Sequence, residues 1–109
     1  NERRSIHLLC SGSEGELSLE DTLLAGASSS RLAARRSDIR LSETSLLART
    51  LFEGSGRLEG DRLALFRSAR GGQTLLQIGR EEDLLWAAQC DTSTVVPEWS
   101  GTAIVAAVA

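Results

Sequence analysis

The sequence predicts an α/β fold, a three-layer α/β/α arrangement with a mixed sheet of which this chain supplies only part. Three observations lead to this prediction: an apolar run of strand length at Ile6–Cys10, several stretches with helical spacing of apolar residues, and a β-branched tail from Val95. The strand-like segments are too few for a complete sheet. We therefore expect residues 1–109 to form a single partial domain that ends in a β-hairpin.

The amino-terminal stretch is predicted to run from a buried strand through a loop into a helix. The strand Ile6–Cys10 ends at the glycine-containing loop Ser11–Gly15. Ser18 has the character of a helix N-cap, and Asp21 follows three residues later, as in a capping box. In α/β proteins ligands bind where a strand ends and a helix begins, so this junction is the predicted functional centre. One face of the helix is apolar: Leu19, Leu23, Leu24 and Ala27.

The middle of the chain is predicted to be helical with interruptions. Ser28–Ser30 is expected to interrupt the first helix, and residues 31–40 to form either an exposed helix or a mobile connection. A second helix is expected from Ser42 as N-cap to a stop at Gly54–Gly56. Its inward-facing residues are predicted to be Leu46, Leu47 and Leu51.

Glycines also divide the second half of the chain. A helix with Leu63, Phe66 and Arg67 is expected to stop at Gly71 and Gly72. Residues 74–78 fit either a strand or a helical turn, and the three-residue spacing of Leu75 and Ile78 favours helix, closed by Gly79.

Glu81–Asp83 is expected to open the next helix, because negative charge suits a helix amino terminus. Its buried face is predicted to be Leu84, Leu85 and Ala88. Val95–Trp99 and Thr102–Val105 are expected to form a hairpin, with Pro97 at an edge or a bulge.

Composition excludes several classes of function. The net charge is −3, and no basic stripe alternates with aromatic residues, so no nucleic-acid partner is expected. The apolar runs are too short to cross a bilayer, so no membrane partner is expected either. Cys10 and Cys90 lack the pattern of a disulfide scaffold, which favours a reduced, cytoplasmic setting. Met is absent, which indicates a processed chain or the back part of a longer polypeptide.

Acidic residues crowd the predicted functional centre. Glu14, Glu16, Glu20 and Asp21 would repel a phosphate bound at the helix amino terminus unless a cation lay between them. Oxygen ligands of this kind suit Mg²⁺. The alternative is a solvated acidic loop with a helix cap, and spacing alone leaves both open. The neighbouring Cys10 is likewise either a thiol with a lowered pKa or a small buried apolar residue.

Two segments resemble a known family. Leu9–Gly15, Leu17–Asp21 and Ala25–Ala27 resemble the "CAG-x-x-G…F-x-L-E-D…AGA" signature of the 2-phosphosulfolactate phosphatase (ComB) family. Gly79–Asp83 and the stretch from Ala87 to Pro97 resemble that family's closing "G-x-E-x-D…V-V-P" segment. The departures are small: Ser11 replaces the usual Ala, Leu17 the usual aromatic, and Ala87 a frequent Cys.

The resemblance implies a function and a set of site residues. It implies the carboxyl-terminal portion of a magnesium-dependent α/β hydrolase that removes phosphate from a phosphorylated anionic substrate, 2-phosphosulfolactate, on the route to coenzyme M. The N–H groups of Gly12–Gly15 would hold the phosphate, and a cation, Mg²⁺, would lie between it and the carboxylates. The implied residues are, for catalysis, Glu14, Glu20 and Asp21; for phosphate binding, Ser11, Gly12, Ser13, Gly15 and Arg70; and for the metal, Glu20, Asp21 and Asp83.

The sequence leaves two alternatives open. The chain could be a non-catalytic binding or interaction domain that keeps the family fold. It could also be a structural half that needs a missing amino-terminal portion or a separate partner chain. Homo-oligomerisation is a further open expectation.

Overall fold

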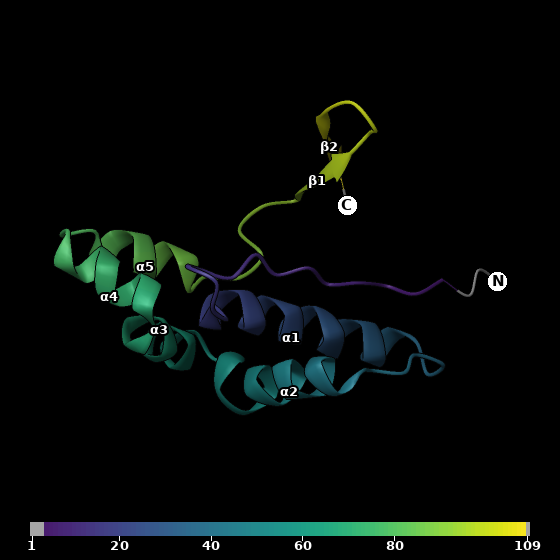
Figure 1. The fold of residues 1–109 in the computed structure, drawn as a ribbon, viewed down its shortest axis with the longest axis horizontal. Helices are drawn as coiled ribbons and strands as arrows, with labels where there is room; N and C mark the ends of the chain where they lie inside the picture. Colours follow the sequence, from purple (N-terminus) through teal and green to yellow (C-terminus); the bar gives the residue numbers. More distant parts are fainter. Residues whose placement is uncertain (1–3, 109) are drawn as a thin grey trace.

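The computed structural model describes residues 4–108. They form helices followed by one two-stranded antiparallel sheet (Figure 1). Within this part of the chain, no helix has both the length and the apolar content needed to cross a membrane. The elements are α1 (Leu19–Arg35), α2 (Glu43–Leu51), the π-helical turn η1 (Phe52–Gly56), α3 (Glu59–Ser68), α4 (Arg70–Gln77), α5 (Glu81–Ala87), β1 (Val95–Trp99) and β2 (Ile104–Val108).

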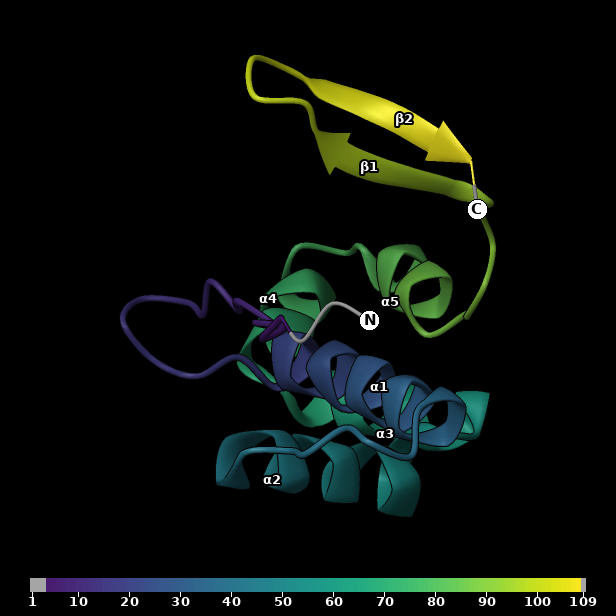
Figure 2. The same ribbon diagram turned by 90° about the vertical axis from the view of Figure 1, so that its right-hand side faces the viewer.

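The helices pack into one body around a small core. Helix α1 lies along α2. Helices α3, α4 and α5 stack together beyond the amino end of α1 (Figures 1 and 2). The buried core residues come from three helices, α1, α3 and α5 with its C-cap, and partly buried apolar residues surround them. These core residues are Leu23, Phe66, Leu84 and Ala88.

Helix α1 starts where the sequence predicted and runs further than predicted. Ser18 is the N-cap, and its Oγ accepts a hydrogen bond from the Asp21 N–H at 3.3 Å. The expected interruption at Ser28–Ser30 is wrong, because the helix continues through it to Arg35. Ser29 is fully buried, and a Cβ atom at Gly26 would overlap the Ala48 carbonyl oxygen of α2. Small residues on this face let the two helices approach closely, and that packing outweighs the weak helix propensity of serine.

Helix α2 confirms its predicted start but not its inward face. The Ser42 Oγ accepts from the Ser45 N–H, as expected of an N-cap. Leu46 and Leu47 are exposed and Ala48 is buried instead, because the close contact with α1 admits only a small side chain. Leu51 packs against the core, as predicted.

Of two predicted helix stops, the one at Gly54–Gly56 is confirmed, because the helical run of α2 and η1 ends at Gly56, and the one at Gly71 and Gly72 is wrong. Gly54–Gly56 continues from α2 as the turn η1, and a Cβ atom at Gly56 would lie 2.6 Å from Leu23 Cδ1. Gly71 and Gly72 lie inside the first turn of α4, and a Cβ atom at Gly72 would overlap the Phe66 carbonyl oxygen. Gly56 therefore both ends the helical run and permits close packing against α1, whereas Gly72 marks close packing between α3 and α4 and not a helix end.

The remaining helix predictions are mostly confirmed. Residues 74–78 belong to α4 and its C-cap, as the helical alternative required. Gly79, with φ of +74°, closes α4, and the Arg80 N–H donates to the Leu75 carbonyl at 2.8 Å. In α5, Leu84 and Ala88 are buried as predicted, whereas Leu85 is exposed.

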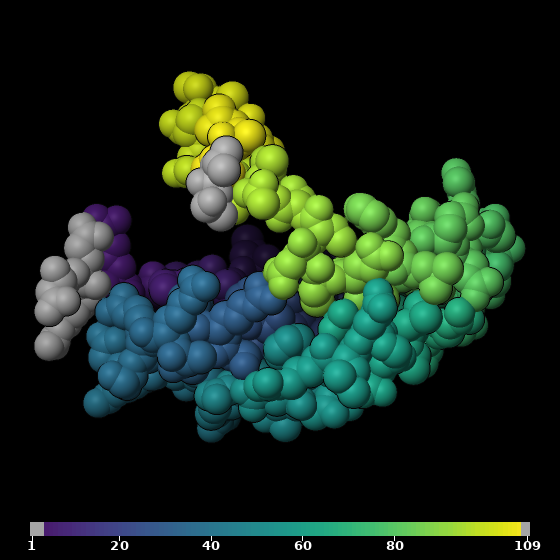
Figure 3. Space-filling view, turned by 180° about the vertical axis from the view of Figure 1, so that it is seen from behind, coloured from purple at the N-terminus to yellow at the C-terminus, as the bar shows by residue number. Residues whose placement is uncertain are grey.

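The tail forms the predicted hairpin, and its second strand starts at Ile104, two residues later than expected. Pro97 lies on an edge strand, since both strands of a two-stranded sheet are edges. The hairpin projects from the helical body (Figure 3).

The predicted buried strand at Ile6–Cys10 is wrong within the described residues. The segment is exposed and pairs with no strand of residues 4–108. A strand is buried only when neighbouring strands and a covering layer are present, and the hairpin provides neither. The structure is mixed helix and strand, and the three-layer arrangement does not form within it.

Glu53 connects three of the helical elements. Its carboxylate accepts from Arg49 Nε of α2 and from Ser30 Oγ of α1, both at 2.9 Å. Arg57 lies 3.5 Å away. The hydrogen bond from Arg49, followed by the one from Ser30, lowers the pKa of Glu53 below its ordinary value of 4.5.

We expect Arg49→Gln to raise the pKa of Glu53 toward 4.5, measured by NMR titration of its side-chain carbon. The pKa of Glu53 is lower in the folded state than in the unfolded state. The Arg49–Glu53 pair therefore makes its full contribution to the free energy of unfolding above pH 4.5, and this contribution is lost as the pH falls through the folded-state pKa. Arg36→Gln, which removes the partner of Asp38 instead, should leave the pKa of Glu53 unchanged. An unshifted pKa in Arg49→Gln would contradict the assignment.

Candidate functional site

The loop before α1 is a tight left-handed turn. Ser13 and Glu16 exchange two backbone hydrogen bonds of 2.9 Å. The two residues between them, Glu14 and Gly15, have φ of +51° and +76°, the geometry of a type I′ turn. Gly12 also has positive φ, and a Cβ atom there would lie 2.5 Å from the Glu16 carbonyl oxygen. Gly12 is therefore required for the loop to fold back on itself.

Asp21 ties this loop to the amino terminus of α1. Its Oδ2 accepts from the Gly12 N–H at 3.0 Å and from Ser11 Oγ at 3.5 Å. Its backbone N–H donates to Ser18 Oγ. The capping prediction is thus confirmed for Ser18, but the Asp21 carboxylate reaches the loop rather than the N-cap backbone. Asp21 Oδ1 accepts no hydrogen bond within residues 4–108.

Two amides of the loop remain available for a ligand. The N–H groups of Gly12 and Ser13 are already used within the loop, so the expectation that all four amides of Gly12–Gly15 hold phosphate is too broad. Those of Glu14 and Gly15 donate to no acceptor in the described part of the chain. They belong to the loop that Asp21 ties to the amino terminus of α1, and the N–H groups at that terminus carry positive potential. This combination favours an anion.

Arg70 holds the loop from the side of α4. Its Nη1 lies 3.0 Å from Glu16 Oε2, and its Nη2 donates to the Leu17 carbonyl at 3.2 Å. Sequence reasoning missed the role of Glu16, because nothing local links it to a residue more than fifty positions away. The guanidinium of Arg70 is engaged with the loop and braces it.

The other predicted acidic residues are dispersed. Glu14 is exposed in the turn, and a Cβ atom at Gly71 would lie 3.3 Å from Glu20 Oε1, which places the Glu20 carboxylate over the first turn of α4. Asp83 is exposed in the first turn of α5. Among residues 4–108 no three His, Cys, Asp or Glu side chains form a group able to hold a metal ion. Glu20, Asp21 and Asp83 are therefore not brought together as a three-carboxylate site by this part of the chain.

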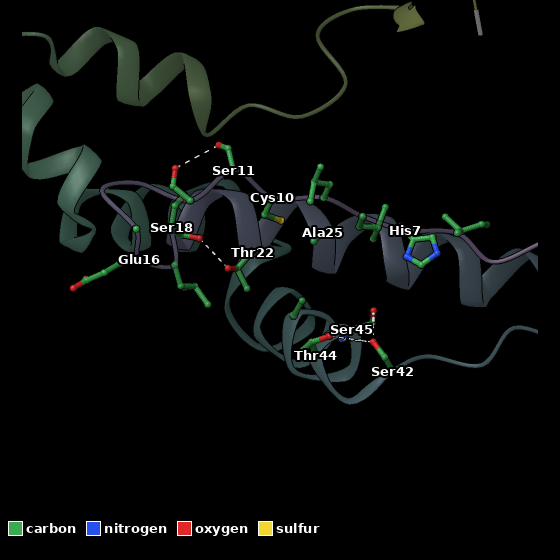
Figure 4. Close-up of a pocket in the computed structure, with 17 residues that line it drawn as sticks. His7, Cys10, Ser11, Glu16, Ser18, Thr22, Ala25, Ser42, Thr44 and Ser45 are labelled. Carbon is green, nitrogen blue, oxygen red and sulfur yellow. Dashed lines mark hydrogen bonds between the residues drawn. The ribbon is translucent and has the colours of Figure 1, made fainter. Parts of the chain in front are cut away.

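A groove of about 640 Å³ lies between the extended amino-terminal segment, α1 and the amino end of α2 (Figure 4). Of the predicted phosphate-binding residues, Ser11, Gly12 and Gly15 line it, and the acidic residues Glu14, Glu20 and Asp21 do not. No sequence pattern indicated that α2 would contribute to this site. Its hydroxyl groups line the groove at Ser42, Thr44 and Ser45, opposite His7 and Cys10 (Figure 4).

Comparison with known proteins agrees with the resemblance seen in the sequence. The family model described as 2-phosphosulpholactate phosphatase matches residues 1–102. A probable 2-phosphosulfolactate phosphatase of Symbiobacterium thermophilum is 32% identical over 92% of this chain and 42% of its own length. A protein of Synechocystis with the same description is 37% identical over 87% of this chain and 39% of its own length.

A third relative, from Synechococcus, is 39% identical over 84% of this chain and 37% of its own length, and it too is described as a probable 2-phosphosulfolactate phosphatase. No solved structure matches the chain significantly. The chain spans about two fifths of the length of these relatives and corresponds to their carboxyl-terminal part. The chain belongs to the 2-phosphosulfolactate phosphatase family.

Proposed function

We propose that this chain is the carboxyl-terminal part of a phosphatase that hydrolyses a phosphorylated sulfo- or hydroxy acid, such as 2-phosphosulfolactate, to sulfolactate and phosphate. Family membership supports the reaction class. The observation that carries the proposal is the turn that Asp21 anchors to α1, in which the Glu14 and Gly15 amides donate to no acceptor within residues 4–108. Such a turn suits a phosphoryl group, which has several oxygens to be held.

The residues of the turn would bind and orient the phosphoryl group. Backbone N–H groups of Glu14 and Gly15 would donate to its oxygens, and Ser11 and Ser13 would add hydroxyl donors. Phosphoryl transfer depends mainly on such positioning and on stabilisation of charge. Arg70 acts indirectly, by holding Glu16 and Leu17 in place.

We propose Mg²⁺ as the cofactor. The residues of the loop provide one suitable ligand: Asp21 is half-buried, and its Oδ1 accepts no hydrogen bond among the described residues. One carboxylate can be enough, because Mg²⁺ in proteins usually binds only one or two carboxylates, and substrate oxygens and waters complete its coordination. When bound, the ion would neutralise phosphoryl charge and lower the pKa of a coordinated water. Asp21 would hold it. Glu14, Glu20 and Asp83 are proposed to orient water or the ion.

We further propose that the complete protein has the three-layer α/β/α architecture. The described helices would form one outer layer. Ile6–Cys10, which is extended and exposed here, would be a strand of the mixed sheet, with the remaining strands supplied by the amino-terminal part of the polypeptide. That arrangement would bury the apolar side chains that the isolated segment leaves in solvent.

The proposed function is tested by Asp21→Asn in the full-length polypeptide, defined as this chain preceded by the amino-terminal part that its relatives carry. The change removes the charge and keeps the size. Phosphate release from 2-phosphosulfolactate in the presence of Mg²⁺ should fall about 100-fold, the effect of losing one well-placed charged group. The matched control is Asp38→Asn, at an exposed carboxylate paired with Arg36, which should retain activity. Unchanged release in Asp21→Asn would refute the assignment.

A non-catalytic binding domain is the second candidate. It is favoured by one observation, the lack of a three-carboxylate group within residues 4–108. Under this alternative the unmodified full-length polypeptide would bind phosphate or a phosphorylated acid without hydrolysing it. Calorimetric titration with 2-phosphosulfolactate, followed by an assay for released phosphate, separates the two candidates.

A further inference from the structure

The hairpin has no support from the rest of the described chain. Strand β1 contacts β2, and neither strand contacts any helix (Figures 1 and 3). An isolated two-stranded hairpin is only marginally stable in water, and stability usually requires a third strand or a helix packed on one face. The hairpin therefore has the character of an incomplete sheet.

One face of the hairpin is entirely apolar along the described strands. Cross-strand partners lie on the same face of a sheet, and successive residues alternate between faces. Pro97 pairs with Ala106, and Trp99 with Ile104, so these residues share one face with Val95. Trp99 is 66% exposed and Ile104 is 74% exposed. Glu98, the single charged residue of the two strands, belongs to the opposite face. We call Val95, Pro97, Trp99, Ile104 and Ala106 the apolar face.

The two outer edges of the hairpin differ in their capacity to pair. The Ser100 N–H donates to the Ala103 carbonyl at 2.9 Å, so that pair is hydrogen-bonded. Antiparallel pairs alternate between bonded and non-bonded, which makes Glu98 and Val105 a bonded pair and Pro97 and Ala106 a non-bonded one. The backbone nitrogens of Pro97 and Ala106 therefore point outward, away from the partner strand.

Proline determines which edge can accept a strand. Pro97 has no N–H, so the outer edge of β1 lacks a donor at its centre. The outer edge of β2 keeps the N–H groups of Ile104 and Ala106. An added strand would find a full set of donors only beside β2, and Pro97 protects β1 against pairing.

We propose that the outer edge of β2 is the docking site for a β-strand from the amino-terminal part of the polypeptide, which would extend the sheet that carries the apolar face. This inference rests on the proposed function in one respect, that the chain acts as part of a longer family polypeptide. The occupant is argued from length: the relatives extend well beyond this chain, which covers 42% and 39% of two of them. Strand addition at an exposed sheet edge is an established mode of docking.

Amide hydrogen exchange tests the proposal without any measurement of activity. In the 109-residue chain alone, the outward N–H of Ala106 should exchange rapidly. In the full-length polypeptide its exchange should be slower by about 100-fold or more, as for an amide in a stable ladder. The amide of Val105, bonded within the hairpin, reports whether the hairpin itself is formed. Equal rates for Ala106 in the two proteins, with Val105 protected in both, would overturn the proposal.

A pair of variants separates backbone pairing from side-chain packing. Ala106→Pro removes the outward donor of β2 and leaves the internal hairpin bonds in place, whereas Ala106→Ser keeps the N–H. We expect the first to abolish the protection at Ile104 in the full-length polypeptide and the second to preserve it. Protection in the isolated chain together with a doubled native mass would instead identify a second copy as the occupant and overturn the proposal.

Discussion

Arg62→Met is expected to destabilise the protein by about 3 kcal/mol, because three backbone carbonyls would each lose a hydrogen bond from a charged donor at a cost of about 1–3 kcal/mol. Arg62 is 8% exposed. Its Nε donates to the Ala88 carbonyl at 2.7 Å, and its Nη1 donates to the carbonyls of Gly56 at 2.8 Å and Arg57 at 2.7 Å. These bonds join η1, α3 and the end of α5, so the loss affects the whole helical body. Removal of the buried charge recovers some desolvation energy. The expected loss is therefore about 1 kcal/mol for each of the three hydrogen bonds, the low end of that range.

Thermal unfolding measures this effect. A loss of about 3 kcal/mol corresponds to a fall in Tm of about 12 °C or more in a domain of this size. The control is Arg57→Met, at an exposed arginine that pairs with Glu53 at 3.5 Å, where the loss should stay below about 0.5 kcal/mol. Arg62→Lys should give an intermediate Tm, because an ammonium group cannot reproduce the planar fork of the guanidinium. An unchanged Tm in Arg62→Met would contradict the role given to these three bonds.

Arg62 also illustrates what the sequence could reveal about the fold. It precedes Phe66 by four residues in α3, so it lies on the buried face of that helix. An arginine at such a position indicates a buried cation that needs acceptors. The acceptors themselves could not be predicted, because they are carbonyls at the ends of two other elements and depend on how the helices meet.

Features set by neighbouring residues were predicted well. The N-caps Ser18 and Ser42 and the left-handed Gly79 depend on hydrogen bonds within a few residues of the chain. The helix stop predicted at Gly71 and Gly72 was wrong, because a glycine that terminates a helix and one that admits a neighbouring backbone look alike in a sequence. Only tertiary packing distinguishes them.

In the candidate site, too, contacts between near neighbours in the sequence could be predicted and contacts between distant residues could not. The link between Ser18 and Asp21 is local and was predicted from their spacing. The ion pair between Arg70 and Glu16 joins α4 to the loop before α1, residues far apart in the sequence, and was not predictable. The buried strand predicted at Ile6–Cys10 failed for a related reason. Its apolar pattern indicates burial, but that burial requires strands that residues 4–108 do not contain.

Gly72→Ala should destabilise the protein by about 3 kcal/mol, at the upper end of the range for overpacking. The added Cβ would overlap the Phe66 carbonyl oxygen and lie 2.6 Å from its carbonyl carbon. These are backbone atoms at the end of α3, and no side-chain rotation can relieve the overlap. Helix α4 would have to move away from α3, which would open the core around Phe66, a buried residue. Urea unfolding should show the loss as a lower midpoint.

The matched control has the opposite expected sign. Gly60 lies in the first turn of α3, is exposed, and has no atom within 4 Å of the position of an added Cβ. Gly60→Ala should therefore stabilise the protein by about 0.5–1 kcal/mol, since alanine loses less backbone entropy in a helix. The same chemical change would then raise the urea midpoint at one helix start and lower it at the other. If both variants shifted the midpoint in the same direction, the close approach of α3 and α4 would not be what requires glycine at position 72.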